Sequence, residues 1–395
     1  MRSVGTVVRG IRTPIIKAND DLANIVVDSL LRAKENEGFE FRDKDVVAVT
    51  EAVVAISENN YATVDDIAED IKNKFPSGNI GLVDPILSRN RFSVLLKGIA
   101  RGCKHLTIQL SFPSDEEGNG ILDEDKFDES EFDLSSVITE KEYNDVFGDF
   151  LHPFTGINMV DFYRDLVKSE GCEVEFVFSN DPRTILNYSK DVLVASIHTR
   201  FKTKKMLKNA GGNVILGLDD ILCTSINNSG YNSKYGLLGS NKSTEEKVKL
   251  FPEHGDKLVE EVHNKLVQKT GKNIEVMVYG DGCFKDPVGR IWELADPVVS
   301  PAYTSGLEGT PNELKLKYLS DNKFANLTGD ELKAALVTEI KGKAKDLKGT
   351  MQTQGTTPRR LTDLIGSLCD LTSGSGDKGT PVVYIQGYFD NLSNE

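Results

Sequence analysis

The most informative stretch of this 395-residue chain is Ile274-Glu-Val-Met-Val-Tyr-Gly280-Asp281-Gly282. Its apolar residues alternate with Glu, Met and Tyr up to the first glycine, which is the period-2 pattern of a β-strand. A helix is predicted just before it, because Leu258, Val262 and Leu266 recur at the spacing of one helical face and Gly271 follows as a stop. A helix that leads directly into a strand is typical of layered α/β structure.

The same order of elements recurs elsewhere in the chain. Apolar residues at helical spacing in 22–30 precede the β-rich run 46–49, and a similar helical stripe in 92–99 precedes the apolar run 106–110. Near the end, Thr357 is predicted to cap a helix with Pro358 at its first position, and 382–385 reads as a closing strand. We therefore predict an α/β fold with a mixed sheet.

The length favours more than one compact unit, since a single core rarely grows beyond about 250–300 residues. We predict an N-terminal α/β part at 1–113, an accessory region at 114–190 and a C-terminal α/β part at 191–395. Residues 114–147 are densely acidic and lack a clear period, which predicts an exposed insertion. A solvated face explains such a run most simply, although Asp115 and Glu117 beside a Gly-Asn pair could also bind a cation.

The composition restricts the function classes. A formal net charge of −14 disfavours nucleic acid and anionic membrane as partners, so a small molecule is expected. The five cysteines show no CxxC spacing, which favours a reducing compartment. Because no apolar run approaches membrane-spanning length, we expect a cytoplasmic protein.

The segment 280–296 concentrates charged residues around the end of the predicted strand. In α/β sheets ligands gather beyond the carboxyl ends of strands, and a carboxylate there is well placed to hold a divalent cation against phosphate oxygens. The competing interpretation is a tight turn with a capping aspartate. We predict metal ligands and catalytic residues in this segment: Asp281, Asp286, Glu293 and Asp296 for the metal, with Asp281, Lys285 and Arg290 in catalysis.

Two other segments could contact an anion. The glycine-rich stretch 227–244 ends where Ser243 and Glu246 predict a helix start, and backbone amides at such a start suit phosphate; an ordinary polar loop fits the stretch equally well. Arg359 and Arg360 lie in the predicted first helical turn, where the helix dipole disfavours cations, and an anionic partner would explain them.

Three segments together resemble the coenzyme F420-0:L-glutamate ligase (gamma-glutamyl ligase) family. The first is Gly10-Ile-Arg-Thr-Pro-Ile-Ile-Lys-Ala-Asn-Asp-Asp-Leu22, which is similar to the nucleotide-contacting turn near the start of that family. The second, 278–287, is similar to its metal motif at a strand end. The third, made of 360–364 and 379–387, is similar to its closing helix and strand.

The resemblance implies a two-lobed mixed-sheet fold, Mg²⁺ or Mn²⁺, GTP or ATP as co-substrate, and amide-bond formation through an acyl phosphate. Its partners would be a glutamate-like amino acid, an unidentified carboxylate acceptor and a second copy of the chain in a homodimer. The residues expected to contact the nucleotide are Pro14, Ile15, Ile16, Lys17, Asn241, Thr357, Arg359 and Arg360.

The sequence also departs from the family pattern. Gly282 stands where the family has a threonine after the metal aspartate, the family's lysine after the second strand has no match in 51–57, and its second metal aspartate is replaced by Asn or Ser near 228–232. These departures keep an alternative function open, a non-catalytic protein that binds a nucleotide or metabolite on a ligase fold.

Overall fold

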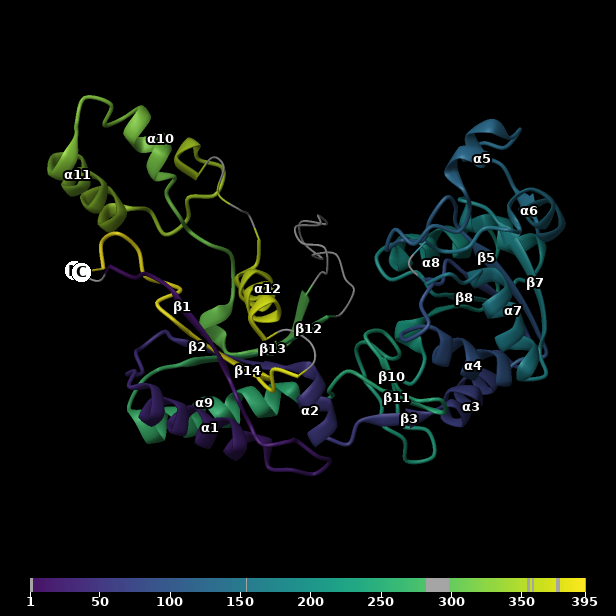
Figure 1. Cartoon of the computed structure of the whole chain (residues 1–395), viewed down its shortest axis with the longest axis horizontal. Coiled ribbons are helices and arrows are strands. Elements are labelled where there is room, and N and C mark those ends of the chain that lie inside the picture. Colours follow the sequence, from purple (N-terminus) through teal and green to yellow (C-terminus); the bar gives the residue numbers. More distant parts are fainter. Residues whose placement is uncertain are drawn as a thin grey trace. The chain divides into compact units, whose positions relative to one another are not determined.

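The computed structural model describes residues 3–153, 155–281, 298–353, 356, 359–373 and 377–394, and it confirms the α/β class (Figure 1). The chain forms two compact units, one made of residues 1–57 and 254–395 and the other of 58–253. The three segments predicted from the sequence do not coincide with these units. The second unit is inserted as one piece into the first, and only contacts between residues distant in the sequence reveal such an arrangement.

A five-stranded mixed sheet forms the centre of the first unit. Its strand order is β1-β14-β2-β12-β13, and β12 runs parallel to β2 while all other neighbours are antiparallel. The predicted strand at 274–281 is confirmed as β12. The strands are β1 (Val7–Ile11), β2 (Val46–Thr50), β12 (Glu275–Asp281), β13 (Val298–Tyr303) and β14 (Val382–Gln386).

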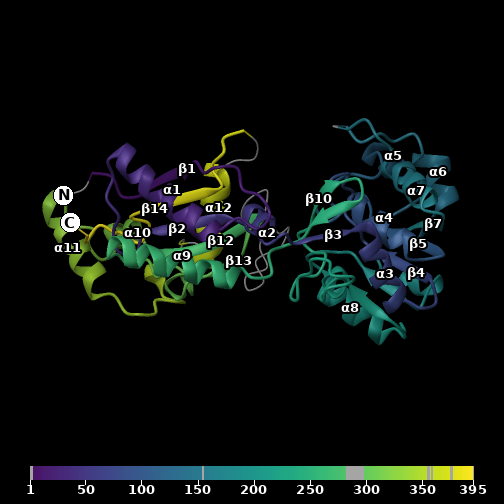
Figure 2. The same cartoon turned by 90° about the horizontal axis from the view of Figure 1, so that it is seen from below.

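Helices cover both faces of this sheet. Helices α1 (Leu22–Glu37) and α9 (Gly255–Thr270) lie side by side on one face, where Val47, Val276 and Tyr384 point (Figures 1 and 2). Helix α12 (Leu361–Ser373) packs on the other face. The strict alternation of buried side chains between the two faces is the reason why the central strands read as continuous apolar runs.

The remaining elements of the first unit extend this core. Helix α2 (Glu51–Ser57) follows β2 without a loop, and α10 (Leu316–Asp321) packs with α11 (Gly329–Gly342) around a small core of leucines. Two short 3-10 turns lie at Ser305–Leu307 and Met351–Thr353. The helix predicted to begin at Pro358 begins instead at Leu361, whose N–H donates to the Gly309 carbonyl at 3.0 Å.

The second unit is built on a six-stranded sheet with the order β6-β7-β5-β4-β8-β9. All neighbours are parallel except the short edge strand β6. The strands are β4 (Asn79–Val83), β5 (His105–Leu110), β6 (Ile138–Thr139), β7 (Glu173–Phe178), β8 (Val192–Val194) and β9 (Ile215–Gly217). The helices and 3-10 turns of this unit are α3 (Val64–Lys74), α4 (Ser93–Arg101), α5 (Glu124–Glu129), α6 (Glu140–Phe147), α7 (Met159–Ser169), η1 (Pro182–Asn187), α8 (Arg200–Asn209) and η2 (Leu218–Asp220).

A small antiparallel sheet replaces the helix start predicted near Ser243. Strands β10 (Asn241–Thr244) and β11 (Lys247–Lys249) form a hairpin, and β11 pairs with β3 (Tyr61–Thr63). The Ser-x-x-Glu spacing was therefore a wrong signal here, because pairing with β3 outweighs the local capping preference. The helix itself begins at Gly255, twelve residues after Ser243.

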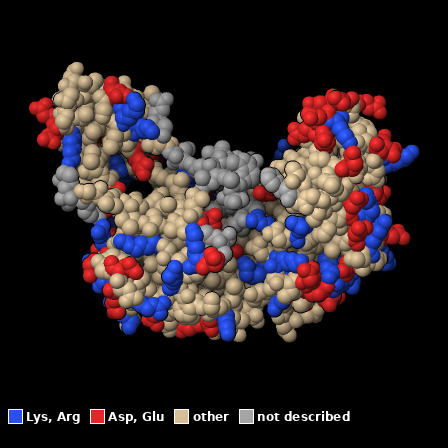
Figure 3. All heavy atoms as spheres, viewed as in Figure 1, with Lys and Arg blue, Asp and Glu red and all other residues tan. Residues whose placement is uncertain are grey.

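The acidic run 114–147 is only partly an exposed insertion. Acidic side chains do gather over the part of the second unit that carries α5 (Figures 1 and 3). However, Tyr143 and Phe147 are buried, and the Tyr143 ring stacks on Phe178 with centroids 4.1 Å apart. Because β6 also pairs with β7, the prediction of an excursion throughout this segment is wrong.

The first two carboxylates of this run, Asp115 and Glu116, accept hydrogen bonds from backbone N–H groups. Asp115 accepts backbone N–H bonds from Leu87, Glu117 and Asn119 at 2.7–2.9 Å. Glu116 accepts the backbone N–H groups of Ile197 at 2.7 Å and of His198 at 3.1 Å. Within the described ranges, no group of three His, Cys, Asp or Glu side chains could hold a metal ion. A structural role therefore explains these residues better than a cation site.

Asp84, which follows β4, gives a testable pH dependence. Burial and the nearby Glu116 carboxylate raise its pKa from 3.8 to about 7. The folded state therefore keeps a proton that the unfolded state loses above pH 3.8, so this group lowers stability progressively as the pH rises from about 4 to 7. At 1.36 kcal/mol per pKa unit the full effect is at most about 4 kcal/mol, and we expect about half because the side chain is only half-buried.

We therefore expect Asp84→Asn to stabilise the protein more at pH 8 than at pH 5, by about 1–2 kcal/mol in the free energy of unfolding. Asn carries no charge and tolerates the positive φ of 51° at this position. Urea unfolding at the two pH values measures the difference. If Asp84→Asn changes the free energy of unfolding by the same amount at pH 5 and at pH 8, the proposed titration of Asp84 is contradicted.

Candidate active site

Four chain segments meet at one edge of the five-stranded sheet in the first unit. Because β2 and β12 are parallel, with Tyr279 opposite Thr50, their carboxyl ends lie side by side. The antiparallel strand β14 begins at the same edge, where Thr50 donates its N–H to the Pro381 carbonyl at 2.9 Å, and β1 ends there with Ile11 opposite Val382. We call this edge, formed by Ile11, Thr50, Gly280-Asp281 and Pro381, the carboxyl edge. The three segments of the family resemblance therefore converge at one place.

Glu51 is the acidic residue that the structure adds to this edge. It is the first residue of α2 and is only 5% exposed. A Cβ atom added to Gly280 would lie 2.1 Å from the Glu51 Cγ, so the Glu51 side chain fills the space that the glycine leaves open. This contact places a carboxylate directly beside the residue that precedes Asp281. In the sequence, position 51 stands out only by lacking the family lysine, although an acid directly after a buried strand is itself a signal.

The predicted nucleotide turn extends from the carboxyl edge to the start of α1. The Thr13 N–H donates to the Gly379 carbonyl at 3.4 Å, and the Lys17 N–H donates to Asp20 Oδ2 at 2.7 Å. Asp21 caps α1 by accepting the Asn24 N–H at 3.1 Å. Helix α1 therefore begins next to the edge, and the Asp21 carboxylate caps its N-terminus.

Four predicted nucleotide contacts lie in this turn, and three of them are open to solvent. Pro14, Ile15 and Lys17 are exposed, and Ile15 is 84% exposed although it is a large apolar residue. Ile16 instead packs against the core between α1 and the sheet. These exposed residues follow directly on Ile11 and Thr13, which lie at the carboxyl edge.

Tyr279 fastens α12 to the same edge. Its buried hydroxyl donates to Ser373 Oγ at 2.8 Å, and burial raises the pKa of this tyrosine well above its usual range. Because Ser373 is the last residue of α12, the carboxyl end of this helix lies at the carboxyl edge.

Arg359 and Arg360 therefore lie at the opposite end of α12 from the carboxyl edge. Arg359 is only 5% exposed, and Arg360 is close enough to Tyr303, at the far end of β13, to influence its pKa. The structure does not bring these two arginines together with Gly280 and the nucleotide turn. Their predicted position near a helix start is correct, but a local sequence pattern does not indicate which end of the helix faces the site.

The other predicted residues fall in three groups. Asn241 belongs to the second unit, in strand β10 and not at a helix start. The backbone of Asp281 ends β12 and pairs with Val298, while its side chain lies outside the described part. The remaining predicted residues lie outside the described residues: Lys285, Asp286, Arg290, Glu293, Asp296 and Thr357.

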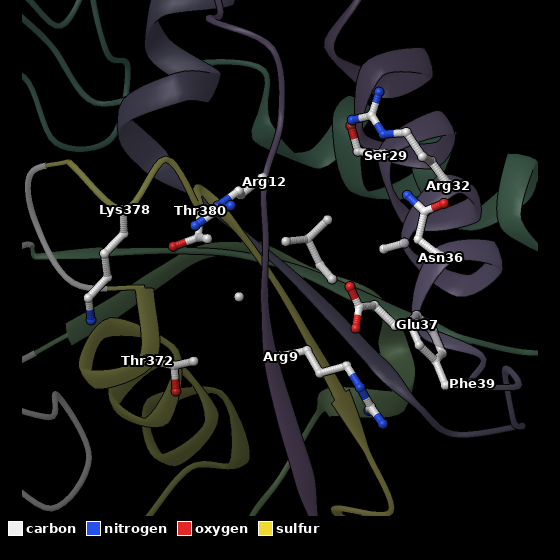
Figure 4. A pocket seen from close by; sticks show the side chains of 13 residues that line it. Arg9, Arg12, Ser29, Arg32, Asn36, Glu37, Phe39, Thr372, Lys378 and Thr380 are labelled. Atoms are coloured by element: carbon white, nitrogen blue, oxygen red, sulfur yellow. The ribbon is translucent and has the colours of Figure 1, made fainter.

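A basic pocket of about 720 Å³ opens along the outer strand β1 of the same unit (Figure 4). Its cationic lining consists of Arg9 and Arg12 from the β1 segment, Arg32 from α1, and Lys378 from the segment before β14. These residues do not form a recognisable group in the sequence, because they are far apart in the chain. We call this cavity the β1 pocket.

The arrangement of the carboxyl edge is that of an α/β enzyme, with its ligand site beyond the ends of parallel strands. The family model for F420-0:Gamma-glutamyl ligase matches residues 10–387, which is nearly the whole chain. The chain belongs to this family, and we therefore assign it as an enzyme of ligase type. No curated protein gives a significant match. Among the helices of the described ranges, none has both the length and the apolar character needed to cross a membrane.

Proposed function

We propose that the protein is a nucleotide- and divalent-metal-dependent ligase. The carboxylate of an acceptor acid attacks the γ-phosphate of GTP or ATP, giving an acyl phosphate and the nucleoside diphosphate. The amine of a glutamate-like amino acid then attacks the acyl carbon, forming the amide and releasing inorganic phosphate. The observation that carries the proposal is the convergence of the nucleotide turn, Gly280-Asp281 and the start of β14 at one sheet edge.

The carboxyl edge fits a Mg²⁺ or Mn²⁺ ion. These cations prefer carboxylate oxygens, and the buried Glu51 side chain lies against Gly280, next in sequence to Asp281. We propose that Glu51 and Asp281 hold the ion together, which supplies the second carboxylate that the sequence comparison with the family lacked. When bound, the ion would neutralise charge on the transferring phosphoryl group.

Some of the other predicted residues keep a proposed role at this site, and others do not. Pro14 to Lys17 would position the nucleotide, since they lie at the carboxyl edge beside the N-terminus of α1. Lys285 and Arg290 remain proposed catalytic cations, and Asp286, Glu293 and Asp296 remain proposed metal ligands. Arg359 and Arg360 are no longer placed at this site, because they lie at the far end of α12. The homodimer stays a prediction, for which sedimentation velocity is the direct measurement.

Glu51→Gln is expected to weaken Mn²⁺ affinity about tenfold with nucleotide present, because the amide keeps the shape of the side chain but loses the charge that a cation needs. Calorimetric titration measures the affinity. Glu260→Gln on the exposed surface of α9 is the matched control and should bind Mn²⁺ like the wild type. If both variants bind Mn²⁺ equally well, Glu51 is not a ligand.

Acceptor-dependent nucleotide consumption tests the ligase proposal. Purified protein is incubated with GTP or ATP, Mn²⁺, glutamate and fractions of small carboxylic acids, and phosphate release is followed together with product masses. We expect release that requires an acid, and a product whose mass equals acid plus glutamate minus water. If the protein binds nucleotide but no acid fraction leads to its consumption, a non-catalytic binding function is supported instead.

The second candidate is a non-catalytic protein that binds a nucleotide or metabolite. It is favoured by one observation: α2, which follows β2 at the carboxyl edge, contains no lysine anywhere in Glu51–Ser57. An anionic substrate would lose a cationic contact there. Under this candidate nucleotide binding would persist while turnover is absent.

A further inference from the structure

The β1 pocket concentrates positive charge in a strongly acidic chain. Four cationic side chains line it against a single carboxylate, that of Glu37, so the lining carries a charge of +3 although the chain carries −14. Its volume of about 720 Å³ lies within the range of small-molecule sites. A concave surface of one sign raises the local concentration of ligands of the opposite sign.

Two of the cations, Arg9 and Arg32, contact neighbouring side chains. Arg32 Nη2 donates to Ser29 Oγ at 3.4 Å. Arg9 lies over the Phe39 ring at 4.7 Å, and its Nη1 donates to Gln386 Oε1 at 2.6 Å. Gln386 is fixed in turn, since its Nε2 donates to the Glu40 carbonyl at 2.7 Å. These contacts hold the guanidinium in position. Among the described residues they engage one of its five N–H donors, and no carboxylate there forms an ion pair with it. Such prior positioning reduces the entropy lost on binding.

The other two cations have no polar partner of their own in the part of the chain that the structure describes. The Arg12 and Lys378 side chains make no hydrogen bond or ion pair there, and both are exposed within the pocket (Figure 4). By contrast, many surface cations of this protein are paired, such as Lys265 with Glu261 at 3.4 Å. Positive charge that a protein leaves unpaired inside a cavity is available to an anion.

The spacing of these groups indicates more than one anionic contact. Arg9 and Arg12 are three residues apart along the edge of the sheet, so their backbones lie about 10 Å apart. Ser29, Asn36 and Thr380 also line the pocket, and their polar groups can orient a ligand by hydrogen bonds. Phe39 and Ala33 supply apolar surface for the rest of the molecule.

We infer that the β1 pocket binds a small molecule with at least two oxyanion groups, phosphate or carboxylate. The nearer part of the pocket, with Arg12 and Thr380, adjoins the carboxyl edge, whereas Arg9 and Phe39 form its far part. The inference stands without the ligase proposal, because it uses neither Asp281 nor a metal ion.

The test uses inorganic pyrophosphate and citrate as probes, titrated by calorimetry in buffer that contains EDTA. We expect saturable binding of at least one probe at submillimolar to millimolar concentration, weakened by added salt. Tighter binding of pyrophosphate identifies a phosphorylated ligand, and tighter binding of citrate identifies a polycarboxylate. The double variant Arg12→Gln/Lys378→Gln should bind at least tenfold more weakly.

Two further variants separate the pocket from general surface charge. Ala33→Phe leaves every charge in place but fills the cavity, and it should also abolish binding. Lys269→Gln removes an exposed cation from α9, outside the pocket, and should leave affinity unchanged. Asp281→Asn should bind the metal-free probes like the wild type, so a failed ligase proposal would not imply a failed pocket. Absence of binding by the wild type, or unchanged affinity in both the double variant and Ala33→Phe, would overturn the inference.

Discussion

Asp281→Asn is expected to reduce ligase turnover about a thousandfold or more while leaving the melting temperature almost unchanged. Asp281 ends the strand β12 at the carboxyl edge, between two glycines that allow a ligand to approach the backbone closely. The amide keeps the shape of the side chain but cannot neutralise a cation. If the ion supplies about 4 kcal/mol to the phosphoryl-transfer step, its loss corresponds to this factor.

The competing explanation for Asp281 is a turn residue, for which Asn would serve nearly as well. Turnover and thermal unfolding should therefore be measured together on the wild type, Asp281→Asn and the control Asp28→Asn, which changes an exposed carboxylate on α1. Turnover within a factor of about three of the wild type in Asp281→Asn would assign the residue to the turn and leave the proposal without its metal ligand.

Gly280→Ala is expected to lower activity by about a hundredfold and to destabilise the protein by about 1–3 kcal/mol. The added Cβ would lie 2.1 Å from the Glu51 Cγ and 3.0 Å from the Glu51 Cβ. The first distance is a steric clash, so one of the two side chains must move. Glu51 is buried and begins a helix, so it can move only by disturbing α2 or by leaving the carboxyl edge. In either case the proposed metal carboxylates separate.

A double-variant cycle distinguishes the steric effect from the chemical one. Gly280→Ala combined with Glu51→Ala relieves the clash and should recover most of the lost stability, but not the activity. Gly342→Ala, at the end of α11 with no atom within 4 Å of the added carbon, controls for the substitution itself. A Gly280→Ala protein that is as stable and as active as the wild type would show that Glu51 does not occupy the position described here.

Local patterns predicted the parts of the first unit that position the site. The alternation in 274–281 and the helical stripe before it correspond to β12 and α9, because both elements bury one periodic face against the same core. The three segments of the family resemblance were identified in the sequence, and the sheet register shows that they meet at one edge.

Features that depend on distant contacts could not be predicted. The insertion of residues 58–253 as one unit, the position of Glu51 against Gly280, and the β1 pocket all arise from pairs of residues far apart in the chain. The error near Ser243 has the same origin, since pairing between β11 and β3 determines the structure of a segment whose local signal favours a helix. Likewise, the burial of Tyr143 on Phe178 is invisible in a run dominated by acidic residues.

In the proposed function, Glu51 and Asp281 at the carboxyl edge would hold a divalent cation needed for nucleotide binding. The most direct measurement is calorimetric titration of Mn²⁺ in the presence of a non-hydrolysable GTP or ATP analogue, on the wild type and on Asp281→Asn. The account predicts saturable Mn²⁺ binding by the wild type that depends on the analogue, and affinity at least a hundredfold weaker in the variant. Equal Mn²⁺ affinity in the two proteins would contradict it.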